Sequence, residues 1–196
     1  MTPTTSSTKT NPVGLETLAI TYSCDKLYRH SYIPFYQQLF TSMRWNNETK
    51  KLLEIGIGYE QMMGQFVPKY VHGASLRMWR DYLPETSILA CDIHENTLFQ
   101  EERIATTWCD QSNPAALLDM VRLFRGNFDV VIDDGSHQHE DQLISAATLL
   151  PYMAPGGHYI IEDVWADKGE VLAKHFKGTL VRGEKTGDDN LVVVRV

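Results

Sequence analysis

Short apolar runs and amphipathic segments alternate along most of the chain. Five apolar runs of strand length lie at residues 51–58, 87–92, 104–110, 128–134 and 158–163. Between them lie segments whose apolar side chains recur every three or four residues, at 75–83, from Pro114 to Phe124, and from Leu143 to Leu150. Runs of this kind are typical of buried strands, and the three- and four-residue spacing is typical of helices.

Two of these helices carry a start signal. Ser75 stands before the apolar positions of the segment 75–83, and we expect its hydroxyl to cap that helix. Asn113 is followed by Pro114, which gives a polar cap and a proline at the first helical position. The sequence therefore predicts helix starts near residues 75 and 114.

Alternating strands and helices predict a mainly parallel sheet with helices on both faces. The last two apolar runs, 178–184 and 190–196, are joined by residues 185–188 without a helix, which favours an antiparallel hairpin at one edge. In such sheets a ligand lies at the carboxyl ends of the strands, near the point where the strand order reverses. The acids and glycines that end these strands are therefore the candidates for function.

Length and composition favour one α/β domain. The chain has 196 residues, of which 43% are hydrophobic, enough for one complete core. Residues 1–13 are rich in Thr, Ser and Pro, so we expect a disordered tail there and a single domain over 14–196. This tail has neither an apolar core nor an arginine, which disfavours a secretory or transit signal.

Charge and cysteine content narrow the function. The net charge is −7 without a Lys/Arg cluster, which disfavours nucleic acid as a partner. No apolar run reaches the roughly 18 residues of a membrane helix, so we expect no membrane partner. Three scattered cysteines favour neither a disulfide framework nor a Cys-x-x-Cys metal site. We expect a cytoplasmic protein that acts on a small molecule.

The first strand ends in Glu54, Gly56 and Gly58, and the second ends in Asp92. Glycines let the backbone approach a ligand, and an acid at the second position can bind a ribose. A plain strand-to-loop turn explains the glycines equally well, and without a third glycine and an immediate helix an NAD oxidoreductase is disfavoured. Asp110 could border an adenine, although a turn or helix-cap role is the simpler interpretation.

Four carboxylates end the fourth and fifth strands. Asp133 and Asp134 close one, and Glu162 and Asp163 close the other. If the strands are neighbours, about 5 Å apart, these groups need a positive charge among them. Oxygen ligands without sulfur favour Mg²⁺, and His137 nearby could act as a base. Alternatively, some of the acids are solvated or cap helices, and we give the functional site the greater weight.

Several segments now make the chain recognisable, among them LLEIGIG, SLRMWRDYLP, CDQSNPAALL, FDVVIDDGSHQHEDQ and PGGHYIIEDVW. Together with the upstream D-K-x-x-x-H-x-Y pattern, they resemble the S-adenosylmethionine-dependent O-methyltransferases that modify macrolide deoxysugars, of the mycinamicin VI and demethylmacrocin type. The resemblance runs from about residue 22 to 196. It implies a Rossmann-like class I methyltransferase fold, whose seven-stranded, mostly parallel sheet has an antiparallel last strand.

The resemblance also implies roles for individual residues. Asp134, Glu162 and Asp163 would hold Mg²⁺, with Asp134 also in the catalytic set and His137 as the general base. His30 and Tyr32 could reach the site from the upstream segment. Residues 59–73 could cover an apolar acceptor or serve for packing. The residues implied to bind S-adenosylmethionine are Glu54, Gly56, Gly58, Ser75, Asp92, Ile93, Asp110, Gln111 and Asp133.

The expected reaction is methyl transfer to a hydroxyl of a small molecule, in particular a sugar or polyol. A catechol or phenol acceptor with the same cofactor and metal is the first alternative, because vicinal aromatic hydroxyls also chelate Mg²⁺. A methyltransferase fold that binds cofactor or a partner without methyl transfer is the second. The resemblance also makes a homo-oligomer a candidate assembly.

Overall fold

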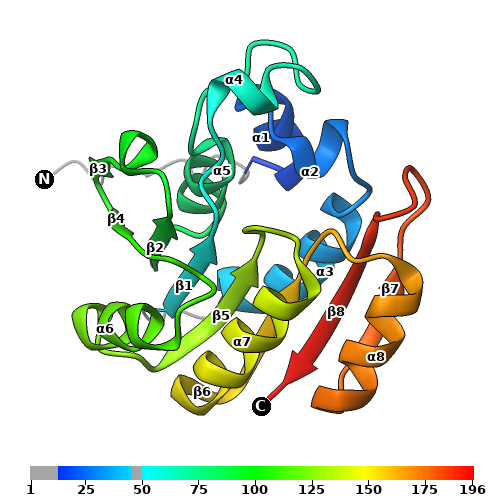
Figure 1. Cartoon of the computed structure of the whole chain (residues 1–196). Coiled ribbons are helices and arrows are strands. Elements are labelled where there is room, and N and C mark those ends of the chain that lie inside the picture. The colour runs from blue at the N-terminus through cyan, green and yellow to red at the C-terminus, as the bar shows by residue number, and fades with distance from the viewer. Residues whose placement is uncertain (1–12, 46–49) are drawn as a thin grey trace, which may run out of the picture.

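The computed structural model describes residues 13–45 and 50–196 (Figure 1). The tail predicted over residues 1–13 therefore lies, apart from Val13, outside the described residues. Three helices come first: α1 (Leu15–Thr21), α2 (Asp25–Tyr28) and α3 (Ile33–Trp45). No helix in the described residues is both long enough and apolar enough to cross a membrane.

Strands and helices then alternate as the hydrophobic pattern predicts. The strands are β1 (Lys50–Ile55), β2 (Thr86–Asp92), β3 (Gln100–Glu101), β4 (Ile104–Trp108), β5 (Phe128–Asp133), β6 (Met153–Ile161), β7 (Thr179–Arg182) and β8 (Asn190–Arg195). The helices among them are α4 (Glu60–Met63), α5 (Ala74–Tyr82), α6 (Pro114–Phe124), α7 (His139–Leu149) and α8 (Ala166–Phe176), with short 3-10 turns at Glu95–Thr97 and Leu150–Tyr152.

All these strands join one sheet in the order β3-β4-β2-β1-β5-β6-β8-β7. The strands from β4 to β6 pair in parallel, and β8 is antiparallel to both of its neighbours. The predicted mostly parallel sheet with an antiparallel last strand is confirmed. The two-residue β3 adds an eighth strand, where seven were expected. β8 also lies between β6 and β7, so the hairpin has β7 at the edge of the sheet.

Helices cover both faces of this sheet (Figure 1). Leu52 of β1 belongs to the apolar core formed with α1, α3 and α5, whereas the adjacent Leu53 belongs to the core formed with α6, α7 and α8. Successive side chains of a strand point to opposite faces, so a strand buried on both sides reads as a continuous apolar run. The central strands could be predicted from the sequence for this reason.

The predicted helix starts have different outcomes. Asn113 caps α6 as expected, and its Oδ1 accepts from the Ala115 amide at 2.9 Å. The expectation for Ser75 is wrong: α5 begins at Ala74, after Gly73 at φ +73°, without a side-chain cap. Glycine adopts this left-handed conformation at little cost, so the chain turns into the helix earlier. His137 lies in the loop before α7, which starts at His139.

The strand order reverses around β1, which has β2 on one side and β5 on the other. The carboxyl ends of β1, β2, β4, β5 and β6 therefore meet at one edge of the sheet. The upstream helices α1 and α2 lie above this edge (Figure 1). A ligand site is expected where a parallel sheet changes direction in this way.

Candidate active site

A cleft of about 570 Å³ opens over the carboxyl ends of the central strands. Its size lies within the range of ordinary small-molecule sites. Three of the predicted site residues, Glu54, Asp133 and Glu162, do not line it and lie behind its wall. Those that do line it are Gly56, Gly58, Ser75, Asp92, Ile93, Asp110, Gln111, Asp134, His137 and Asp163.

Gly56 brings the backbone of β1 against the loop after β5. Its φ is +93°, and a Cβ built on it would lie 2.0 Å from the carbonyl oxygen of Asp134. The Gly56 amide also donates to the Cys91 carbonyl at 2.8 Å. Both the backbone conformation and the close approach therefore require glycine here, and the approach fixes the position of Asp134.

We expect Gly56→Ala to destabilise the protein by clearly more than Gly156→Ala. Gly156 also has a positive φ, +79°, but a Cβ there would meet nothing within 4 Å. Gly156→Ala should therefore cost only the conformational term of about 1–2 kcal/mol, to which Gly56→Ala adds a backbone clash. Urea unfolding of both variants measures the difference. Equal losses of stability would show that Asp134 yields freely to the new methyl group.

Asp92 faces the cleft and organises the backbone around it. Its Oδ2 accepts from the Ile57 amide and its Oδ1 from the His94 amide, both at 2.8 Å. Each carboxylate oxygen keeps a lone pair for another donor. Asp92 can therefore accept from a diol in the cleft while it holds the chain on both sides.

Gln111 connects the cleft wall to a buried carboxylate. Its Nε2 donates to Asp133, and its Oε1 accepts from the Ser136 amide at 2.9 Å. Burial raises the pKa of Asp133 to about 6, although hydrogen bonds from Ser145, Tyr159 and Gln111 oppose this shift. Asp133 therefore supports the wall from behind.

Asp110 forms a turn at the rim of the cleft. Its Oδ1 accepts from both the amide and the hydroxyl of Ser112, at 2.9 and 2.7 Å. This is the turn role that the sequence allowed. The residue also lines the cleft, so its second oxygen remains available to a ligand.

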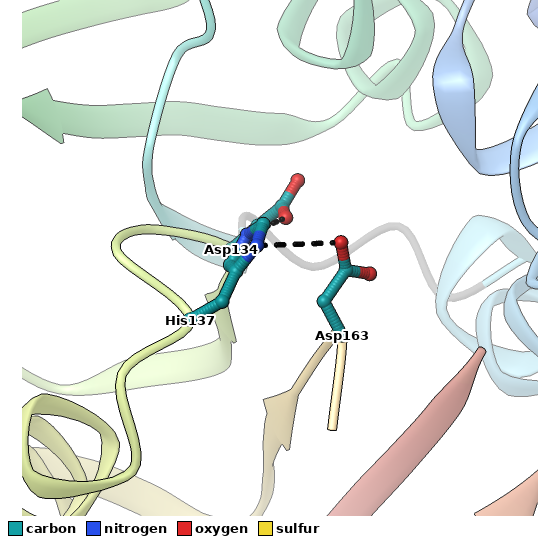
Figure 2. Close-up of side chains that lie close together, drawn as sticks. All are labelled: Asp134, His137 and Asp163. Carbon is teal, nitrogen blue, oxygen red and sulfur yellow. Dashed lines mark hydrogen bonds and ion pairs between the residues drawn. The ribbon is translucent and has the colours of Figure 1, made fainter. Parts of the chain in front are cut away.

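Asp134, His137 and Asp163 come together at one end of the cleft (Figure 2). Nε2 of His137 lies 3.2 Å from Oδ1 of Asp134, and its Nδ1 lies 3.5 Å from Oδ2 of Asp163. One donor atom from each residue lies within 4.8 Å of the others. Two carboxylates and an imidazole are a donor set that fits a divalent cation.

The three groups are electrostatically coupled. Withdrawal from water would lower the pKa of His137, but the hydrogen bond to Asp134 and the charges of both carboxylates raise it to about 9. Burial would raise the pKa of Asp134, and the charges of Lys26 and His137 instead hold it well below its usual range. The His137 side chain is 38% exposed at the cleft, so a ligand can reach the ring.

Glu162 lies outside this triad. Its Oε2 is 2.6 Å from Lys26 Nζ, and its Oε1 accepts from the Tyr36 hydroxyl. Neither Lys26 nor Tyr36 was predicted from the sequence to belong to the site. Lys26 belongs to the D-K-x-x-x-H-x-Y pattern of residues 25–32, and this was the only feature of the sequence that could have indicated a role for it. Nothing local in the sequence distinguishes a buried lysine from an exposed one.

Two further side chains of the same pattern, Tyr32 and His30, contact Asp163 of the site. The Tyr32 hydroxyl donates to Asp163 Oδ1 at 2.9 Å, and His30 Nε2 lies 3.3 Å from Asp163 Oδ2. Both residues therefore reach the site, as the sequence suggested.

A latch holds this segment in place. Asp189, in the loop between β7 and β8, accepts from the Ser31 amide at 2.9 Å and from the Ser31 hydroxyl at 2.6 Å. It also accepts from the amides of Glu184 and Lys185, at 2.9 and 2.8 Å. The upstream segment is thereby tied to the far end of the chain.

Residues 59–73 pack against the fold, and several of them also line the cleft. Val67 and Tyr70 are buried in a small apolar cluster with Ala74. Met62 and Phe66 line the cleft and are 44% and 52% exposed, and the guanidinium of Arg29 lies over the Phe66 ring. The segment therefore packs through one side and presents an apolar rim to the cleft through the other.

The chain is similar in sequence to several methyltransferases, although no protein-family model matches it. Demethylmacrocin O-methyltransferase of Streptomyces fradiae is 40% identical over 136 residues, 69% of this chain and 32% of the relative. Mycinamicin VI 2''-O-methyltransferase of Micromonospora griseorubida is 40% identical over 138 residues, 70% of this chain and 32% of the relative. The chain thus spans about a third of the length of these curated relatives.

Solved structures with a similar fold are also methyltransferases. MycE methyltransferase from the mycinamycin biosynthetic pathway, in complex with Mg, SAH and mycinamycin VI, superposes with a TM-score of 0.69 at 36% identity over 79% of this chain and 40% of that chain. A ribosomal RNA methyltransferase from Plasmodium falciparum shares the fold at a TM-score of 0.52 and 12% identity, over 86% of this chain and 97% of that chain. The fold is therefore that of class I methyltransferases.

Proposed function

We propose that this chain, a homologue of sugar O-methyltransferases over about 70% of its length, transfers the methyl group of S-adenosylmethionine to a hydroxyl of a small molecule. The acceptor we propose is a sugar or polyol, as in the named relatives. The observation that carries the proposal is the meeting of Asp134, His137 and Asp163 at one end of a cleft whose wall also contains Asp92.

The cleft residues would bind and orient the cofactor. Asp92 offers two oxygens to the ribose hydroxyls, and Asp110 and Gln111 border the adenine side. Gly56 lines the cleft, and the methionine end would approach the backbone there. S-adenosylmethionine supplies, when bound, a sulfonium methyl group that is already a good electrophile, so alignment with the acceptor oxygen is the main task of the protein.

Asp134 and Asp163 would hold Mg²⁺, because their carboxylate oxygens are the ligands that this hard cation prefers. Glu162, the third predicted ligand, lies behind the wall, where Lys26 and Tyr36 bond to its two oxygens, so it would have to release one of these partners to reach the ion. Mg²⁺ supplies, when bound, polarisation of an acceptor hydroxyl. Without a cation, the two carboxylates keep His137 protonated at neutral pH, since they raise its pKa to about 9. A divalent cation held by Asp134 and Asp163 would offset their negative charge and lower the pKa of the ring. A ring nitrogen of His137, which is a weaker ligand for Mg²⁺ than a carboxylate is, would then accept the hydroxyl proton.

Calorimetric titration followed by an acceptor panel tests the function. We expect S-adenosylmethionine and its demethylated product to bind, and Mg²⁺ to give a separate isotherm. The panel compares glycosides that carry vicinal sugar hydroxyls with catechols. Methylation of the glycosides supports the proposal, and methylation of the catechols alone would replace the acceptor class. Cofactor binding without any turnover would favour a non-methylating protein.

Asp92→Ala should weaken binding of the demethylated cofactor by at least about 100-fold, because two hydrogen bonds to a charged group are lost and each contributes about 1.5–3 kcal/mol. The Mg²⁺ isotherm should change little, since Asp92 is not among the residues of the metal triad. Titration calorimetry measures both affinities, and Asp119→Ala, at an exposed position of α6, is the matched control. Unchanged cofactor affinity in Asp92→Ala would remove the ribose assignment.

A further inference from the structure

One lysine ammonium lies at the centre of the acidic edge. Lys26, on α2, is fully buried, and its Nζ lies 2.7 Å from Asp134 Oδ2, 2.6 Å from Glu162 Oε2 and 3.2 Å from Glu54 Oε1. These carboxylates belong to the ends of β1, β5 and β6, which are neighbours in the sheet. Three adjacent strand ends therefore share one cation.

The charges around Lys26 keep it protonated. Burial would lower the pKa of a lysine, but the charges of Asp134, Glu162, Glu54 and Asp25 raise that of Lys26 well above its ordinary value. Burial raises the pKa of Glu54, and the charge of Lys26 opposes that rise. Taking an ion pair out of water is costly, and removing one partner costs more because the other charge stays buried.

Lys26 lies behind the cleft wall, apart from the metal triad. Neither Lys26 nor Glu54 nor Glu162 lines the cleft, and Asp134 does. Asp134 turns Oδ2 toward Lys26 and Oδ1 toward His137. One carboxylate is thus shared between a permanent cation behind the wall and the candidate metal site in front of it.

We propose that Lys26 is the permanent counter-ion of this edge and a positioning residue for the metal site. It holds Glu54, Asp134 and Glu162 together whether or not a divalent cation is bound, and it fixes which oxygen of Asp134 faces the cleft. The inference rests on the proposed function for the identity of the metal, Mg²⁺. The charge balance itself depends only on residues of this chain.

Thermal unfolding of Lys26→Met, in a chelator and in Mg²⁺, tests the proposal. Methionine keeps the length of the side chain and removes its charge. In chelator we expect the melting temperature to fall by about 10 °C, because three carboxylates lose their cation. Mg²⁺ should then raise the melting temperature of the variant by more than it raises that of the wild type, since it restores positive charge beside Asp134.

Lys51→Met is the matched control. Lys51 Nζ is bonded to the carbonyls of Phe124 and Gly126, both at 3.2 Å, and lies near the amino end of β1. Its replacement removes a part-buried lysine that does not contact the acidic edge. We expect a smaller loss of stability, equal in chelator and in Mg²⁺.

A second variant separates charge from packing. Lys26→Met combined with Glu162→Gln removes one of the carboxylates that Lys26 balances, so the double variant should melt above Lys26→Met in chelator. A double variant that stays as unstable as Lys26→Met would overturn the counter-ion role. A loss that is identical in chelator and in Mg²⁺, although the wild type binds Mg²⁺, would overturn the positioning role at the metal site. These readouts need no turnover, so absence of methyl transfer in the wild type would contradict the proposed function alone.

Discussion

Replacing His137 with asparagine is expected to lower turnover by about 10²- to 10⁴-fold while cofactor and Mg²⁺ still bind. This is the usual loss when a general base is removed. Asparagine is chosen because His137 has a φ of +58°, a conformation that asparagine tolerates better than most residues. Its amide cannot take up a proton at neutral pH, so the variant removes the chemistry and keeps the backbone.

Steady-state kinetics with a glycoside acceptor and calorimetry with the demethylated cofactor measure the two effects separately. His175→Ala, an exposed position on α8, should leave both unchanged. Turnover at the wild-type level in His137→Asn would show that another group takes the proton. A variant that no longer binds Mg²⁺ would instead identify His137 as a ligand.

Asp134→Asn should lower the affinity for Mg²⁺ and turnover by at least about 100-fold, the upper range for residues that only support a metal ligand. The amide keeps the shape of the side chain but removes the charge that faces both Lys26 and His137. The positive charges of Lys26 and His137 are then no longer balanced by this carboxylate, and they oppose the binding of a cation.

A Mg²⁺ titration of the variant, with Asp167→Asn at an exposed position of α8 as control, decides the assignment. Binding of the demethylated cofactor should persist, because its expected contacts lie around Asp92. An unchanged Mg²⁺ isotherm would exclude Asp134 as a ligand and would move the search to Asp163 and Glu162.

The convergence of acids could be predicted because it follows from strand ends. Each central strand is buried on both faces and appears as an apolar run that stops where the chain leaves the sheet. The residues after these runs must meet at one edge when the strands are parallel neighbours. Asp92, Asp134 and Asp163 came from this argument, and the structure places all three in the wall of the cleft.

The rest of the site depends on contacts that leave no local pattern. Lys26 and Glu162 are separated by 136 positions, and lysine is among the residues least often buried. The resemblance implied a cofactor role for Glu54, near the end of β1, yet its Oε2 accepts from the Trp79 indole at 2.8 Å behind the wall. A side chain at a strand end can face the cleft or lie behind its wall. The groups that pack above the sheet decide between the two, and these groups come from segments that are distant in the sequence.

The latch between Ser31 and Asp189 fixes the order in which the site is completed during synthesis. Its partners are 158 positions apart, so the segment that carries Lys26 leaves the ribosome long before the loop that fastens it. The acidic strand ends emerge in between, with their counter-ion already synthesised and still untethered. Contacts of such long range form late. The upstream segment can therefore be fastened beside the cleft only after the last hairpin has been synthesised and has docked.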